Sequence, residues 1–344
     1  MTDCPVPLNG YDRIVMGHGG GGRLSGELLR KVFLPAYGNE VLSRLEDQAT
    51  LPWPGGRLAF TTDAFVVRPI FFPGGDIGKL AVNGTVNDLA VGGARPLFLS
   101  AAFILEEGLL LSDLERIVAS MKEACRVARV QLVTGDTKVV DQGKGDQVFI
   151  ATSGVGAVPD GVSLSIAAAR PGDKIVLSGT IGDHGMAIMC RREGIELETT
   201  LESDTAPLAD LAQMALRACP GIRLMRDPTR GGLASTLNEM AAASKVGVRI
   251  DEDQIPVKAE VRGACEILGL DPLYVANEGK LVAVLPEPQA DRLVETLREH
   301  PLGRSAAVIG EVLADGPGLV RLKSRVGGER IVSLLAGEPL PRIC

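Results

Sequence analysis

The order of apolar and polar positions predicts that strands and helices alternate along most of the chain. Residues 77–90 are apolar at helical spacing, whereas short runs such as residues 147–158 are typical of strands. We expect strands at residues 58–67 (interrupted at 61–63), 96–105, 131–134, 147–158, 174–178, 246–250, 280–285 and 306–312. We expect helices at residues 24–33, 77–90, 110–127, 186–193, 207–218, 233–244, 257–268 and 289–300, and a hairpin at residues 318–335.

Both halves of the chain therefore mix helices and strands, and Pro159-Asp160-Gly161 is the expected boundary between them. A chain of 344 residues usually folds as two domains. We expect an α/β domain at residues 1–158, an α+β domain at residues 159–335 and a flexible tail at residues 336–344.

Composition narrows the classes of function. Hydrophobic residues make up 45% of the chain and charged residues 23%, which is usual for a globular protein. The net charge is −7 without a basic run, so nucleic acid and membranes are not expected partners. There is no apolar stretch of about 18 residues, and the N-terminus lacks the pattern of a signal peptide. We expect a cytoplasmic protein.

The six cysteines never form a Cys-x-x-Cys pair, so neither a zinc knuckle nor a dithiol redox motif is predicted. Four of them lie in or beside apolar runs of helical spacing and are not expected to react. These four are Cys125, Cys190, Cys219 and Cys265. The thiols that remain free to react are Cys4 and Cys344.

The tail that carries Cys344 is expected to be an extended arm. Gly337, Pro339 and Pro341 disfavour helix and sheet alike. About nine extended residues span roughly 30 Å, enough to enter a cleft or to reach another protein. The adjacent α-carboxylate disfavours the thiolate and should raise the pKa of the thiol, which suits a thiol that another enzyme loads. The alternative is a frayed end with an incidental cysteine.

Four aspartates lie in small-residue turns or in an apolar helix rather than on a charged face. They are Asp63, Asp88, Asp136 and Asp227. Buried carboxylates that converge usually need a cation. The glycine-rich run at residues 17–22 is not a Walker A motif, but its amides could surround an anion. The pattern predicts Mg²⁺ between carboxylates and nucleotide phosphates. The alternative is that each aspartate caps a helix or a turn.

Several motifs together resemble the HypE family of hydrogenase maturation proteins, in the order of that family. They are TTDAFVV (61–67), GGDIGKLAVNGTVNDLAVGGA (74–94), GDTKVV (135–140), SGTIGDHGMAI (178–188), RDPTRGGL (226–233), ANEG (276–279) and the terminal PRIC. The central glycine- and aspartate-rich motifs are similar across the wider PurM-like superfamily of ATP-dependent enzymes related to aminoimidazole ribonucleotide (AIR) synthetase. The combination of GDHG with a terminal PRIC is the specific part.

The resemblance implies a fold, partners and a reaction. The fold is PurM-like, with an N-terminal sheet that joins the partner's sheet in a homodimeric barrel and an α+β domain behind the cleft. A carbamoyltransferase, HypF, loads Cys344 as S–CO–NH₂, and ATP-dependent dehydration converts this group to S–C≡N. The product supplies cyanide to the iron of a [NiFe] hydrogenase through the HypC–HypD assembly complex.

The resemblance also implies roles for individual residues. Phosphorylation by ATP would turn the amide oxygen into a good leaving group, with Mg²⁺ and a lysine offsetting charge. The catalytic set is Cys344 as the loaded thiol, Lys138 as the electrostatic or proton-handling group, Glu278 as the base and His184 as the second candidate for the base. The metal set is Asp63, Asp88, Asp136 and Asp227. The nucleotide-binding set is Lys79, Asn87, Gly135, Thr137, Thr229 and Gly231. A salt-bridged lysine, a turn-capping glutamate and a structural histidine are the alternatives.

Two other classes of function stay open at this point. A selenophosphate-synthetase-like or AIR-synthetase-like enzyme would act on a free small molecule, although Cys4 lacks the glycine-flanked setting of the reactive residue in selenophosphate synthetase. A non-enzymatic carrier would only present a thiol-bound group to a metallocentre assembly partner. ATP consumption by the loaded protein separates an enzyme from a carrier.

Overall fold

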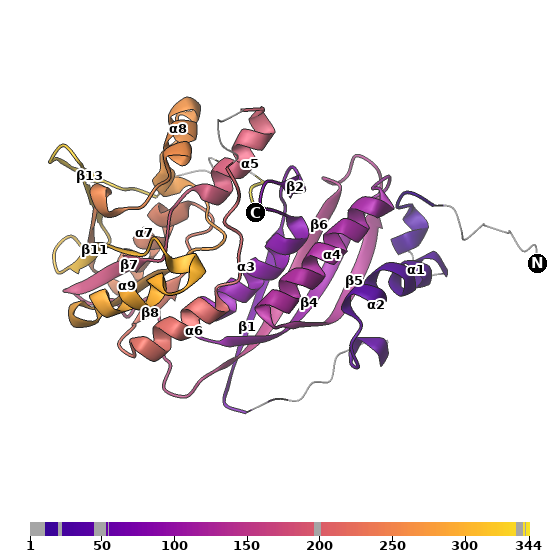
Figure 1. Cartoon of the computed structure of the whole chain (residues 1–344), viewed down its shortest axis with the longest axis horizontal. Helices are drawn as coiled ribbons and strands as arrows, with labels where there is room; N and C mark the ends of the chain where they lie inside the picture. The colour runs from indigo at the N-terminus through magenta and orange to yellow at the C-terminus, as the bar shows by residue number, and fades with distance from the viewer. Residues whose placement is uncertain are drawn as a thin grey trace, which may run out of the picture.

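The computed structural model of the chain has two mixed α/β domains packed against each other (Figure 1). It describes residues 11–19, 23–44, 53, 55–195, 201–334, 340 and 342–344. Cys4 and residues 20–22 of the glycine-rich run therefore lie outside the described residues. Figure 1 shows the C-terminus between the domains, beside β2 (Phe71–Phe72) and α5 (Asp183–Glu193).

The N-terminal domain is a four-stranded sheet with two long helices on one face. Its strands run in the order β1 (Arg57–Phe65), β6 (Val148–Val158), β4 (Arg95–Glu106) and β5 (Gln131–Val140). The β1–β6 and β6–β4 pairs are antiparallel, and β4–β5 is parallel. Helices α3 (Ile77–Val91) and α4 (Leu111–Ala128) lie side by side over the sheet (Figure 1). Their buried side chains face the strands.

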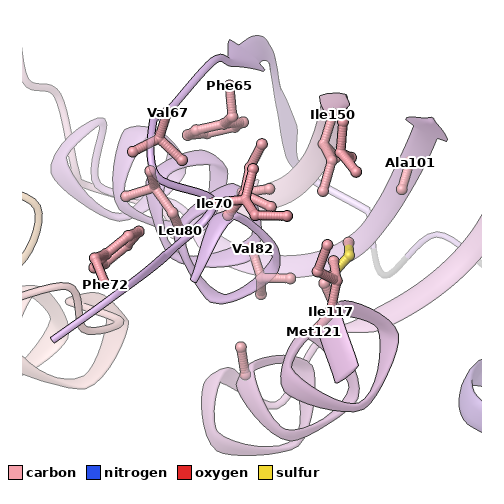
Figure 2. Packing of buried hydrophobic residues seen from close by; sticks show 14 of the residues in the cluster. Phe65, Val67, Ile70, Phe72, Leu80, Val82, Ala101, Ile117, Met121 and Ile150 are labelled. Carbon is pink, nitrogen blue, oxygen red and sulfur yellow. The ribbon is translucent and has the colours of Figure 1, made fainter. Parts of the chain in front are cut away.

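The core of this domain lies between α3, α4 and the sheet. Figure 2 shows Leu80 and Val82 of α3 and Met121 of α4 in one cluster with sheet residues such as Ile150. The two helices can approach closely because position 78 is a glycine. A Cβ on Gly78 would lie 2.7 Å from Cγ of Met121, well inside the normal contact distance.

Strand β5 is longer than the sequence predicts. The expected strand ended at residue 134, with Gly135-Asp136-Thr137-Lys138 in a loop, and this boundary is wrong. The backbone pairs with β4 over the whole segment, with Ala102 opposite Asp136 and Ile104 opposite Lys138. Strand pairing outweighs the low strand propensity of glycine and aspartate. As a result, Asp136 and Lys138 stand on a rigid strand.

The C-terminal domain is a seven-stranded sheet with helices on both faces. Its strands run in the order β13 (Glu329–Ile331), β12 (Val320–Lys323), β9 (Gly247–Asp251), β11 (Ala307–Leu313), β7 (Asp173–Leu177), β10 (Val282–Pro286) and β8 (Leu224–Arg226). Its helices are α5, α6 (Ala209–Ala218), α7 (Gly232–Ser244), α8 (Ala259–Leu268) and α9 (Ala290–Arg298). One apolar cluster joins α7 to the sheet, and another joins α6 and α9 to its opposite face. The predicted terminal hairpin is confirmed as the antiparallel pair β12–β13.

Short elements complete the described chain. They are α1 (Arg23–Leu28), α2 (Leu34–Tyr37), β3 (Gly75–Asp76) and the turns η1 (Met16–Gly19), η2 (Leu29–Phe33), η3 (Leu42–Arg44), η4 (Glu252–Gln254), η5 (Pro272–Tyr274), η6 (Glu287–Gln289) and η7 (Pro301–Gly303). The predicted burial of Cys125, Cys190 and Cys265 is confirmed, and Cys219 is buried too. Among the described helices, none is both long enough and apolar enough to cross a membrane.

Candidate active site

The last three residues of the chain are docked between the two domains. The amide of Val66 donates to a main-chain oxygen of Cys344 at 3.3 Å, and the amide of Arg68 donates to the carbonyl of Arg342 at 3.2 Å. The Ile343 side chain is only 2% exposed and belongs to the same core cluster as the N-terminal domain. This end of the chain therefore lies along the segment that follows β1.

The sequence predicts a flexible tail at residues 336–344, whereas residues 342–344 are docked in the structure. Most of the predicted tail lies outside the described residues, namely residues 336–339 and 341. Residues 342–344 dock because the Ile343 side chain packs into the core cluster and their main-chain oxygens accept hydrogen bonds. The cluster and the donors both come from parts of the chain that are distant in sequence.

Helix α5 holds the docked tail through two side chains. Nε2 of His184 lies 2.9 Å from the carbonyl oxygen of Ile343, and Nδ1 lies 2.7 Å from Oγ of Ser203. Because a carbonyl only accepts, Nε2 carries the proton and Nδ1 accepts from the serine hydroxyl. Two turns later, the Arg192 guanidinium donates to the carbonyl of Arg342 at 2.7 Å and to that of Arg68 at 2.8 Å.

These contacts give His184 a different task from the one predicted. The ring is fully buried, and burial lowers its pKa, so the imidazole is neutral near pH 7. Both ring nitrogens are engaged away from the thiol, by Ile343 and Ser203. The geometry therefore makes His184 a group that positions the tail, and it does not favour His184 as the base.

Cys344 is half-buried, and its thiol lies in a mostly acidic environment. Burial raises its pKa to about 12, and the nearby Glu278 and Asp63 act in the same direction. Arg230 opposes the shift and donates a hydrogen bond to the thiol. The predicted direction of the pKa shift is thus confirmed, but burial is its main cause. Arg230 was missed as a site residue, although it lies in the RDPTRGGL motif and carries a positive charge next to Asp227 in sequence.

Three of the four predicted aspartates converge on this cleft. Asp63 lies on β1, Asp88 on α3 and Asp227 in the loop after β8. Burial raises the pKa of all three, and the pKa of Asp227 rises to about 7, with Asp88 as the second cause. Asp88 accepts a hydrogen bond of 2.8 Å from the hydroxyl of Thr61. Carboxylates that raise one another's pKa in this way form a concentrated negative site.

Glu278 adds a fourth carboxylate to this acidic cluster. It is 2% exposed, and burial raises its pKa well above the ordinary value, with Asp204 and Asp227 as further causes. Its backbone is fixed because its amide donates to the Asp204 carboxylate at 3.1 Å. The next residue, Gly279, must lack a side chain, since a Cβ there would lie 1.9 Å from the carbonyl oxygen of Asp204. The ANEG motif thus presents Glu278 on a rigid turn.

The donor set of the acidic cluster fits a hydrated divalent cation better than a preformed metal cage. Among the described residues, no group of three histidine, cysteine or carboxylate side chains is arranged to hold an ion. Mg²⁺ usually takes one or two carboxylates and keeps waters or substrate phosphates as its other ligands. Asp63, Asp88 and Asp227 supply hard oxygen ligands, and burial disfavours their negative charge and raises their pKa values. A cation would relieve this charge.

Asp136 and Lys138 do not join this cleft within one chain, contrary to the prediction. They form an ion pair of 3.0 Å with each other, and both side chains are 63% exposed. Their strand, β5, and the strand of Asp63, β1, are opposite edges of the sheet. Three strand spacings separate them, or roughly 14 Å. Sequence order could not show this separation.

The predicted nucleotide-binding residues lie in three places, on α3, before α7 and on β5. Asn87 is a clamp between the domains, because its amide donates to the carbonyls of Ala206 and Glu278 and accepts from the amide of Leu208. A role in binding nucleotide directly is therefore not favoured for Asn87. Nζ of Lys79 donates to the carbonyl of Gly74 at 2.8 Å.

Thr229 and Gly231 lie in the tight loop before α7. The amide of Thr229 donates to the carbonyl of Asp227, and Gly231 has a φ of 74° at the N-cap of the helix. A helix of 13 residues with this entry presents free amides that suit an anion. The loop also places Asp227 and Arg230 on either side of the same turn.

Gly135 and Thr137 line a cavity of about 220 Å³ between β5, β4 and the N-terminal helices. Its apolar walls include Phe33 and Tyr37, which stack with ring centroids 6.4 Å apart. The Tyr37 hydroxyl is buried and has no hydrogen-bond partner among the described residues. An apolar slot with an unsatisfied hydroxyl and a polar rim is suited to a flat ligand with polar edges.

Comparison with known proteins decides the family. The N-terminal domain model of AIR synthase related proteins matches residues 45–158, and the C-terminal domain model matches residues 170–323. The carbamoyl dehydratase HypE of Cupriavidus necator is 57% identical over 98% of this chain and 97% of its own length. The chain belongs to the HypE family. The HypE of Escherichia coli is 47% identical over 97% of this chain and 100% of its own length.

Solved structures of HypE proteins agree with this assignment. A HypE in complex with ATP superposes with a TM-score of 0.93, at 48% identity over 96% of this chain and 99% of that chain. A HypE–HypF complex matches with a TM-score of 0.79, at 48% identity over 90% of this chain and 99% of that chain. Thiamine-monophosphate kinase of Stenotrophomonas maltophilia shares only the fold, with a TM-score of 0.62 at 23% identity.

The family assignment confirms the predicted resemblance to HypE and the predicted PurM-like, two-domain fold. Members of the HypE family are carbamoyl dehydratases, so the predicted class of enzyme is confirmed as well. The alternatives of a selenophosphate-synthetase-like or AIR-synthetase-like enzyme and of a non-enzymatic carrier are set aside.

Proposed function

We propose that this protein dehydrates the carbamoylated thiol of its own Cys344 to a thiocyanate, with ATP as the second substrate. The observation that carries this proposal is the docked tail. Cys344 lies half-buried beside Arg230 and Glu278, at the acidic cluster that holds Asp63, Asp88 and Asp227. A carrier that only presents its thiol has no need for this environment. The HypE complex with ATP supports the choice of nucleotide.

The reaction needs two steps that balance. The carbonyl oxygen of S–CO–NH₂ first attacks the γ-phosphorus of ATP, which releases ADP, while one N–H proton leaves to a base. The carbon–oxygen bond of the phosphorylated intermediate then breaks, the second N–H proton leaves with the phosphate, and S–C≡N remains. Phosphate is a far better leaving group than oxide, so phosphorylation is what makes the elimination possible.

Residues of this chain can be placed in that scheme. Arg230, whose positive charge acts on the Cys344 thiol, is the candidate for stabilising the charge that develops on the phosphorylated oxygen. Glu278 is the candidate base. Mg²⁺ held by Asp63, Asp88 and Asp227 would screen the phosphates of ATP and lower the pKa of Glu278 toward the range in which it accepts a proton.

Lys138 and Asp136 would contribute to the reaction in a homodimer, from a second copy of the chain. The open face of the N-terminal sheet exposes Phe60 at 66% and Ile104 at 40%. Lys138 is paired side by side with Ile104 in the sheet, so both side chains point to this face. An exposed apolar sheet face of this kind usually packs against a partner. A homodimer through this face would bury it and bring Lys138 of one copy toward the other copy.

The cavity behind Gly135 and Thr137 is our proposed site for the adenine ring of ATP. Tyr37 offers its unpartnered hydroxyl there, and Phe33 offers an aromatic face. By likeness to the HypE–HypF complex, HypF is the proposed enzyme that loads Cys344. A HypC–HypD complex is the proposed acceptor of the cyano group.

A mass spectrum of the C-terminal peptide tests the proposal. Carbamoylated protein should keep its mass when ATP is added with EDTA, and should lose one water only when ATP and Mg²⁺ are both present. A peptide that keeps the carbamoyl group under all conditions would refute the dehydration. The Cys344→Ala variant should not be loaded at all.

A further inference from the structure

The residues that contact the end of the chain, here called the tail site, bind it mainly through its main-chain groups. A main-chain oxygen of Cys344 accepts from the amide of Val66 at 3.3 Å. The carbonyl of Ile343 accepts from His184 at 2.9 Å. The carbonyl of Arg342 accepts from Arg68 at 3.2 Å and from Arg192 at 2.7 Å. The main-chain oxygens of three consecutive residues thus have donors, as in peptides that bind along an extended segment of another protein.

Side chains of the tail add sequence selectivity to these main-chain hydrogen bonds. Ile343 is 2% exposed and Leu340 is 6% exposed, and both belong to the core cluster that includes α3 and α5. The Arg342 guanidinium forms an ion pair of 3.0 Å with Asp146. Buried apolar anchors beside a main-chain ladder are the usual basis of affinity and specificity in peptide sites. Every one of these contacts is made by residues 340–344 themselves.

None of these contacts depends on the covalent link between the tail and the domain that precedes it. We propose that the tail site is a true peptide site, and that it also takes the carbamoylated tail of a second copy of this chain and dehydrates it in trans. This inference rests on the proposed function, since it keeps the same reaction. The atoms balance as before: the phosphoryl group passes from ATP to the carbonyl oxygen, and ADP, phosphate and S–C≡N are formed.

The docked state sets a bound on the affinity. A short flexible link gives a tail an effective concentration of about 1 mM at its own site. A tail that is docked under these conditions must have an intrinsic dissociation constant below about 1 mM. The same sequence on a separate molecule should therefore bind detectably at millimolar concentration.

The test uses a full-length catalyst whose own tail cannot compete. The double variant Ile343→Asp, Cys344→Ala removes the apolar anchor and the substrate thiol. The probe is a synthetic peptide, Leu-Pro-Arg-Ile-Cys, carrying a carbamoyl group on sulfur. We expect saturable binding with a dissociation constant below about 1 mM, and loss of one water from the peptide after Mg-ATP is added. The same peptide with the Ile343→Asp change should bind at least about tenfold more weakly.

Two further reactions make each outcome decisive. Wild-type protein loaded on its own tail runs in parallel: if it converts while the peptide neither binds nor converts at about 10 mM, roughly ten times the effective concentration, the peptide site is refuted and the proposed function stands. If the wild-type protein also fails to convert its own carbamoylated tail, the proposed function is refuted. Binding of the peptide then decides by itself whether the tail site is a peptide site. If the double variant does not fold, Cys344→Ala serves as catalyst, and conversion must then be slower because its own tail competes.

A protein substrate tests whether a whole second copy can supply the tail. Loaded Glu278→Gln protein carries the substrate but lacks the candidate base, and the double variant carries the base but no substrate. Mixing the two should produce thiocyanate on the Glu278→Gln chain, at a rate that rises with the concentration of the double variant. No conversion in the mixture, with the peptide converted, would limit the site to free peptides and refute the proposal for a second copy.

Discussion

Replacing Asp227 with Asn should stabilise the metal-free protein and, at the same time, weaken Mg-ATP binding severely. Asp227 lies at the centre of the acidic cluster, and burial, followed by the charge of Asp88, raises its pKa from 3.8 to about 7. Asparagine keeps the shape and cannot ionise. The cost of the buried charge therefore disappears in the variant, together with a ligand for the cation.

The sign and the size of the effect follow from linkage. The folded pKa lies above the unfolded one, so the folded state disfavours the carboxylate. The resulting penalty is absent well below pH 3.8, grows as the pH rises and is complete above about pH 7. A shift of about three pKa units corresponds to about 4 kcal/mol at pH 8 and to about 1.7 kcal/mol at pH 5. The variant should gain the difference, about 2–3 kcal/mol, relative to wild type between these two pH values.

Urea denaturation at pH 5 and pH 8, in EDTA and without nucleotide, measures this difference. Asp160→Asn is the matched control, because Asp160 is exposed in the loop between the domains, and its stability should follow that of wild type. If the stabilities of wild type and Asp227→Asn differ by the same amount at both pH values, the carboxylate is not held in a buried acidic site. A second readout, calorimetric titration with Mg-ATP, should show binding for wild type and Asp160→Asn only.

Three further predictions concern the base, the metal and the tail. Glu278→Gln should bind Mg-ATP normally, yet the loaded protein should turn over about 10²–10⁴-fold more slowly in single-turnover mass spectrometry; wild-type rates would exclude Glu278 as the base. EDTA should abolish ATP binding in calorimetry, and undiminished affinity would remove the argument for a metal. Arg192→Ala should lower turnover of the loaded protein by about 10–100-fold at unchanged ATP affinity, since it loses a charged hydrogen bond to the tail. The control is the exposed neighbour Arg191. An equal loss of turnover in Arg191→Ala would contradict the role of Arg192 in holding the tail.

Much of the fold follows from local pattern. The apolar spacing of residues 77–90 places a buried helix there because a helix brings every third and fourth residue to one face. The terminal hairpin and the buried cysteines follow from the same reasoning. The glycine- and aspartate-rich motifs, together with GDHG and PRIC, identify the HypE family. They can be recognised in the sequence because a close backbone contact requires glycine, and a cluster of carboxylates requires acidic residues, at particular positions.

Only the tertiary structure decided which of these residues meet. Asp136 was predicted with the other aspartates, yet strand order places it on the opposite edge of the sheet from Asp63. Asn87 has the residue type of a ligand but clamps the two domains together. Arg230 lies in the RDPTRGGL motif, but its interaction with Cys344 is visible only in the folded chain.

The tail shows the physical reason most clearly. Glycine and proline in residues 336–344 disfavour helix and sheet by local preference, and residues 342–344, which the structure describes, form neither. Whether such a segment docks depends on a groove built from β2, α5 and the segment after β1, which are far apart in the chain. The sequence by itself determines the secondary structure, the family and the thiol at the end of the chain. Long-range packing decides that this thiol lies half-buried near Arg230, Glu278 and Asp63, because burial and hydrogen bonding depend on neighbours that sequence order does not reveal.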